Sequence, residues 1–89
     1  MNTHRQGLAR AWADAIHTRR SALEAHAGLT QAKLARDLGV TPVTVWRWEH
    51  AKGVPSQAMQ AKLVRVLGID PATLHELVRK AEVPSEPAA

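Results

Sequence analysis

The stretch TQAKLARDLGVTPVTVWRWE, residues 30–49, constrains the fold more than any other part of the chain. A helical pattern runs up to Leu38, stops at Gly39 and restarts at Thr41-Pro42. Glycine tolerates the positive φ of a tight corner, and proline in the first turn of a helix has no hydrogen bond to lose. Two helices this short are not stable separately, so the stretch predicts a pair that crosses at a steep angle over a shared core.

The spacing of apolar residues gives both short helices an inner face. The residues predicted to face inward are Leu34, Leu38, Val40, Val45 and Trp48. Ala35 falls where the helices would touch, so a larger side chain there would force them apart. A small residue, a glycine four positions later at Gly39 and a β-branched residue six positions after it at Val45 together indicate a helix-turn-helix arrangement.

The rest of the chain is rich in alanine and leucine and also favours helix, with no alternating β-branched run that would predict a strand. Hydroxyl or carboxylate caps and terminating glycines divide it into five predicted helices, over residues 8–26, 31–38, 42–50, 57–67 and from residue 71 onward. The sequence thus predicts an all-α domain over residues 8–82. A flexible basic arm is expected at residues 1–7 and a disordered tail at residues 83–89.

The three outer helices have their own predicted apolar faces. In the first helix the face is interrupted by Arg19-Arg20 and consists of Trp12, Ile16, Leu23 and Ala27. In the fourth it consists of Met59, Leu63, Val66 and Leu67. In the fifth it consists of Leu74, Leu77, Val78 and Ala81.

Charge and composition narrow the class of function. The 89 residues include 12 Lys and Arg against 8 Asp and Glu, and the net charge of +4 favours a polyanionic partner. The chain has no Cys, and none of its five His forms an i,i+4 pair, so we expect no metal and no cofactor. The sequence contains no acid–base dyad, nucleophile motif or Gly-rich phosphate loop, which argues against an enzyme and a small-molecule substrate.

Targeting signals are not evident in the sequence. The first twenty residues lack the apolar core of a signal peptide, and no stretch approaches the length of a membrane span. We therefore expect a cytoplasmic protein with no membrane partner.

The segment GLTQAKLARDLGVTPVTVWRWEHAKGVPS resembles the lambda-repressor-like family of helix-turn-helix proteins, the Cro/cI or XRE type. The motif LTQ…LA…LGV is similar to the first helix of the pair, and V.RWE to the recognition helix. The likeness extends over about residues 8–78. It implies a compact five-helix domain that binds double-stranded operator DNA, usually as a homodimer, with the third helix in the major groove.

Helical spacing separates the outer face of the third helix from its core face. With Val45 and Trp48 inward, the outer face carries Val43, Trp46, Arg47 and His50. A recognition helix reads bases mainly from its N-terminal half. The predicted base-reading residues are therefore Thr41, Pro42, Val43, Thr44 and Arg47.

The chemistry of these side chains predicts two kinds of base contact. Arg47 can bond guanine O6 and N7 in bidentate fashion, whereas Pro42, Val43 and the Thr44 methyl could contact thymine methyl groups. Relatives in the resembled family often carry glutamine, serine or arginine where Pro42 and Val43 stand. Because of this departure, sequence recognition is expected to depend more than usual on Arg47 and on DNA shape.

Phosphate contacts are expected from helix starts and loops. The predicted phosphate-contacting residues are Gln31, Lys33, Trp46, His50, Lys52 and Gln57. Lys33 and Lys52 could instead be ordinary solvated charges, and Trp46 could equally shield the domain edge or join a dimer contact. In the resembled family the third-helix glutamate pairs with a first-helix arginine. The matching position here is Glu24, so Glu49 is expected to pair elsewhere, with Arg20.

The leading hypothesis is a sequence-specific transcriptional regulator, a small Cro- or repressor-like protein that acts by occupying an operator. Two alternatives stay open: an antitoxin that neutralises a toxin while regulating its own gene, and an architectural or recombination-control protein of a mobile element. A homodimer through Val64, His75 and Val78, or through the C-terminal tail, is a further possibility.

Overall fold

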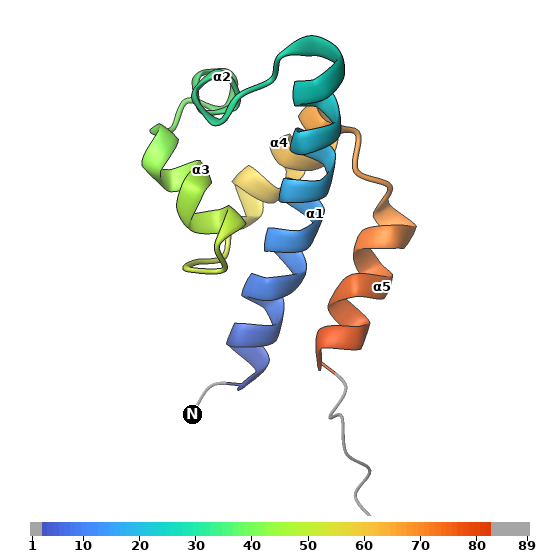
Figure 1. The fold of residues 1–89 in the computed structure, drawn as a ribbon. Helices are drawn as coiled ribbons and strands as arrows, with labels where there is room; N and C mark the ends of the chain where they lie inside the picture. The colour runs from blue at the N-terminus through green and yellow to red at the C-terminus, as the bar shows by residue number, and fades with distance from the viewer. Residues whose placement is uncertain (1–2, 83–89) are drawn as a thin grey trace, which may run out of the picture.

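The computed structural model describes residues 3–82 and confirms an all-α, five-helix domain. The helices are α1 Thr3–Ala27, α2 Gln31–Leu38, α3 Pro42–Glu49, α4 Gln57–Leu67 and α5 Pro71–Glu82. The long α1 packs against α3, α4 and α5, while α2 packs against α3 and α4. In Figure 1, α3 and α5 lie on opposite sides of α1, and α2 is seen nearly end-on while α3 lies below it and is seen from the side.

Side-chain caps set the starts of the shorter helices. Thr30 Oγ1 accepts a hydrogen bond from the Lys33 N–H at 3.1 Å, and Ser56 Oγ accepts one from the Met59 N–H at 3.2 Å. These bonds satisfy N–H groups that have no partner inside the helix. Gly39 ends α2 with φ of +78°, the left-handed conformation predicted for the corner.

The start of α1 differs from the prediction. The helix begins at Thr3 and not near Leu8, so residues 3–7, expected in a flexible arm, belong to the first helix. Gly7 costs a helix only about 1 kcal/mol, and a helix nucleated by the packed segment around Trp12 can therefore extend through it. Residues 1–2 and the predicted tail at residues 83–89 lie outside the described part.

The core confirms the predicted inner faces of α2 and α3. It consists of Trp12, Ala15, Ile16, Leu34, Ala35, Leu38, Val45, Trp48, Leu63, Leu67 and Ile69, with Val40 partly buried against it. Two apolar predictions are wrong. Ala27 is exposed because α1 ends there and the chain turns at Gly28, and Val66 is 39% exposed because it lies about 100° around α4 from the buried Leu67.

Candidate nucleic-acid interface

The α3 helix has one buried and one exposed face, as its spacing predicts. Val45 and Trp48 are buried in the core. On the opposite side Val43 is 64% exposed and Trp46 is 43% exposed, and Arg47 is also exposed. This geometry leaves a projecting helix surface that a partner can reach without any change in the core.

Four of the five predicted base-reading residues, Thr41 to Thr44, lie at the N-terminal end of α3, whereas Arg47 lies in its last turn. Several of their polar groups are engaged within the protein. Thr41 Oγ1 accepts from the Thr44 N–H at 3.2 Å and lies 3.0 Å from Thr44 Oγ1. Thr44 is half-buried, whereas Pro42 is exposed. One guanidinium nitrogen of Arg47 donates to the Lys52 carbonyl oxygen at 3.2 Å, so this side chain lies toward the α3–α4 loop.

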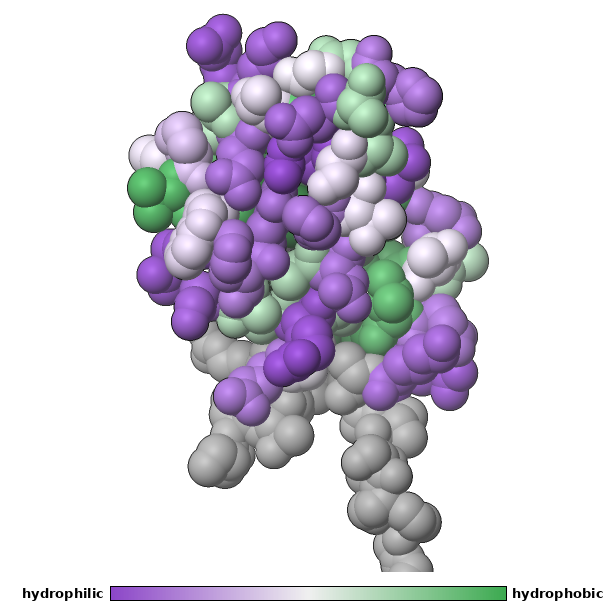
Figure 2. Space-filling view, viewed as in Figure 1, coloured by the Kyte–Doolittle hydropathy of each residue, from purple (hydrophilic) through white to green (hydrophobic). Residues whose placement is uncertain are grey.

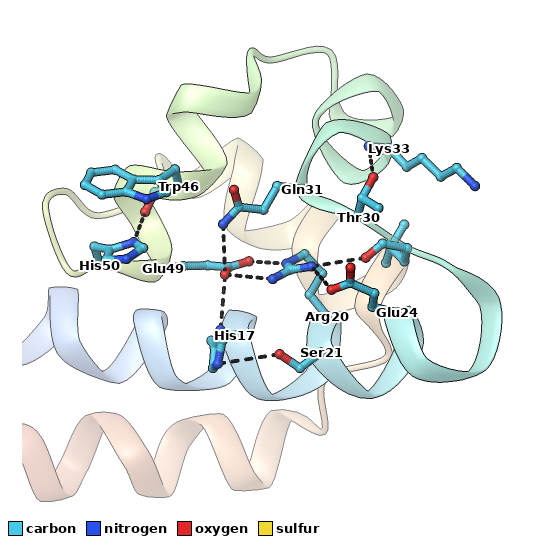
Figure 3. A network of polar contacts seen from close by, with 11 residues as sticks. His17, Arg20, Ser21, Glu24, Thr30, Gln31, Lys33, Trp46, Glu49 and His50 are labelled. Carbon is cyan, nitrogen blue, oxygen red and sulfur yellow. Dashed lines mark hydrogen bonds and ion pairs between the residues drawn. The ribbon is translucent and has the colours of Figure 1, made fainter.

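The position of Trp46, which the sequence left open, is defined by a contact with His50. The two rings stack with centroids 4.0 Å apart and an interplanar angle of 20°. His50 Nδ1 lies 2.8 Å from the Trp46 carbonyl oxygen, and the carbonyl can only accept, so Nδ1 carries the proton. The pair forms an exposed aromatic surface at the C-terminal end of α3 (Figure 3).

The predicted phosphate-contacting residues come from three separate elements. Gln31 and Lys33 lie in the first turn of α2, Lys52 in the α3–α4 loop, and Gln57 at the start of α4. Lys33, Lys52 and Gln57 are exposed. Gln31 is half-buried, and its amide nitrogen donates to Glu49 Oε1 at 3.2 Å, which fixes the orientation of the amide.

The predicted pairing of Glu49 with Arg20 is confirmed and is the centre of a network that joins three helices (Figure 3). Arg20 donates to both carboxylate oxygens of Glu49, to Glu24 Oε1 at 2.8 Å and to the Leu29 carbonyl oxygen at 3.2 Å. Only 2% of the Glu49 side chain is exposed. The network ties α3 and the start of α2 to α1, and so fixes the two elements that carry the candidate interface.

The environment of Glu49 explains its ionisation. Burial favours the neutral carboxyl, but hydrogen bonds from Arg20, His17 and Gln31 outweigh burial and hold the pKa of Glu49 below its ordinary value. The hydrogen bond to Glu49 is also the main reason that the pKa of Arg20 is raised. The carboxylate and guanidinium therefore stay charged at neutral pH although the pair is buried.

Sequence reasoning missed the part that His17 plays. Its Nδ1 lies 3.2 Å from Glu49 Oε1, although the His17 side chain is 62% exposed. Its separation of 32 residues from Glu49 means that no local spacing could have paired them. The one signal was that His17 precedes Arg20 by three positions, which places the two on neighbouring parts of the α1 surface.

The surface around these elements is mostly hydrophilic. Figure 2 shows this, with a hydrophobic patch at the left edge where Figure 1 places α3. Within residues 3–82, no helix is both long and apolar enough to cross a membrane. Across the same residues, no three His, Asp or Glu side chains gather in a way that could hold a metal ion.

Comparison with known proteins identifies the arrangement of α2 and α3. The model of a family described as "Helix-turn-helix domain" matches residues 7–77, which is most of the chain. No curated protein and no solved structure matched. A helix-turn-helix domain is a DNA-binding module that places its second helix in the major groove. The chain belongs to this helix-turn-helix domain family, of the lambda-repressor-like type.

Proposed function

We propose that the protein is a sequence-specific transcriptional regulator that occupies an operator in double-stranded DNA through α3. The observation that carries this proposal is the projecting face of α3, on which Val43 is 64% exposed while Val45 on the other side is fully buried. A surface of this kind on a helix-turn-helix domain is suited to the major groove, whose width admits one helix.

The elements that precede and follow α3 carry groups that can bind DNA phosphates. The first turn of α2 offers Lys33 and the amide of Gln31, and the loop after α3 offers Lys52. Backbone contacts of this type position a protein on DNA, whereas groove contacts select the sequence. The net charge of +4 adds a general attraction to DNA.

The test is selection of bound sequences from random double-stranded DNA at two salt concentrations. A defined motif that persists at the higher salt supports the regulator. Uniform binding that disappears with salt would favour the architectural alternative, and no binding at either salt would overturn both. The symmetry of the motif also reports the assembly: half-sites about one helical turn apart require a two-fold dimer, and an unsymmetrical site indicates a monomer.

The proposed base-reading role of Arg47 has its own test, with Lys52 as the matched control. Arg47→Ala should cost about 1–3 kcal/mol in binding and relax one base position, whereas Lys52→Ala should weaken all sequences alike. Lys52→Ala does not remove the hydrogen bond of Arg47, because that bond goes to the main-chain oxygen of residue 52, which alanine retains. Equal, sequence-blind losses in both variants would refute the role of Arg47.

The candidate homodimer residues Val64, His75 and Val78 line one groove between α1, α4 and α5. We propose this groove as the place to disrupt a dimer if the selected site is symmetrical. Val78→Asp should then lower the apparent molecular mass in sedimentation. A variant that keeps the mass of the unmodified protein would exclude this groove as the contact.

A further inference from the structure

We propose that α3 also reads the C5-methyl groups of thymine, through Pro42 and Val43, in addition to the base contact proposed for Arg47. This inference rests on the proposed function and specifies the DNA chemistry that the same surface recognises. It follows from which groups on α3 are engaged within the protein and which are exposed.

The polar groups at the start of α3 are largely occupied. Thr41 Oγ1 accepts the capping bond from the Thr44 N–H and lies within hydrogen-bond distance of Thr44 Oγ1. Because one of the two hydroxyl groups donates to the other, only one hydroxyl proton of the pair is left for another partner. Breaking the Thr41 cap to read a base would release an N–H of the first helical turn. The guanidinium of Arg47 is partly held by the loop carbonyl of Lys52.

The apolar groups in the same half of α3 are exposed. Val43 is 64% exposed, the most among the large apolar side chains that the structure describes as exposed, and Pro42 beside it is also exposed. Neither side chain has a hydrogen-bonding atom, and the proline nitrogen has no hydrogen to donate. A helix that enters the major groove with these residues foremost meets base edges with methyl and methylene groups.

Thymine is the base that offers an apolar partner there. Its C5-methyl group projects into the major groove, whereas the other three bases present only polar atoms or ring edges. A thymine methyl that packs on Val43 loses water from both surfaces, and burying one such group contributes about a fourfold increase in affinity. Two contacts in one half-site would give roughly a 15-fold preference over the same site without methyl groups.

The test replaces each thymine of the selected site in turn by deoxyuridine, which differs only in the missing methyl group. We expect one or two positions in each half-site to lose about fourfold in affinity and the other positions to be unchanged. In Val43→Ala, thymine and deoxyuridine should bind almost equally at one of these positions. Val66→Ala is the matched control, because Val66 is a partly exposed valine on α4, and it should keep the full preference.

The possible outcomes are distinct. Specific binding that tolerates deoxyuridine at every position would overturn the methyl-reading inference and leave the proposed function intact. A selected site that contains no thymine would do the same. A preference for thymine that survives in Val43→Ala would overturn the assignment to Val43. Absence of any sequence-specific binding would overturn the proposed function itself, and the inference with it.

Discussion

Among individual residues, Glu49 connects the helices of the candidate interface to α1. Its carboxylate is buried and accepts hydrogen bonds from Arg20, His17 and Gln31. Removing one partner of a buried ion pair leaves the other charge in a poorly solvated place, so Glu49→Ala should lower the free energy of unfolding by about 3–5 kcal/mol. Urea denaturation followed by tryptophan fluorescence measures this change.

The matched control for Glu49→Ala is Glu76→Ala. Glu76 also pairs with an arginine, Arg79, but both side chains are about half exposed, and exposed ion pairs contribute little to stability. This variant should unfold at nearly the same urea concentration as the unmodified protein. Equal effects of the two substitutions would show that the Arg20–Glu49 pair has no special role in stability.

The lowered pKa of Glu49 also predicts how stability depends on pH. In the unfolded chain this carboxyl titrates near its ordinary value of 4.5, whereas in the folded protein it stays ionised to lower pH. As pH falls, the unfolded state therefore takes up the proton first. The contribution of ionised Glu49 to the free energy of unfolding is complete well above pH 4.5, and it is lost as the pH falls toward and below the pKa of the folded protein. The stability difference between the unmodified protein and Glu49→Gln should narrow between about pH 6 and pH 3. A constant difference over that range would contradict the assignment.

At the scale of elements, the corner between α2 and α3 depends on Gly39. Its φ of +78° is strained for any residue with a Cβ, although the space where a Cβ would stand is open. Gly39→Ala should therefore destabilise the protein by about 1–2 kcal/mol through backbone strain alone. Gly53→Ala is the control, because Gly53 has equally open surroundings without a positive φ. Thermal unfolding of the two variants tests this, and similar midpoints would remove the backbone explanation.

The same elements show what the sequence could predict. Caps and glycines are local signals, so the bounds of α2 and of α4 and the start of α3 at Pro42 agree with prediction. The start of α1 at Thr3 was missed because helix growth from a packed centre needs no local signal. Arg20, which interrupts the apolar pattern of α1, is nevertheless 6% exposed, since its charge is compensated by a carboxylate 29 residues away.

The interface was predictable to a similar extent. Spacing on α3 correctly separated the buried Trp48 from the exposed Val43, because helical periodicity depends only on sequence. It could not predict that Arg47 bonds the Lys52 carbonyl oxygen or that Trp46 stacks on His50. These contacts depend on side-chain rotamers and on the path of the loop after α3, which neighbouring packing determines.

At the scale of the whole molecule, the net charge of +4 predicts a strong dependence of DNA binding on salt. If each domain neutralises about 4–6 phosphates, the logarithm of the association constant should fall with the logarithm of the salt concentration with a slope of about −4 to −5. Fluorescence anisotropy of a labelled operator between about 50 and 200 mM salt, a range of about 0.6 of a decade, measures this slope.

The location of the charges decides which variants change that slope. Lys33 is exposed in the first turn of α2, and if α2 contacts phosphates as proposed, Lys33→Ala should reduce the magnitude of the slope by about 1. Arg79 is equally cationic but lies on α5, which packs on α1 on the side away from α3 (Figure 1). Arg79→Ala should lower the affinity only slightly and leave the slope unchanged, because a solvated charge far from the phosphates releases no counterion. If both variants shift the slope alike, DNA is attracted by total charge and is not held on the α2–α3 face.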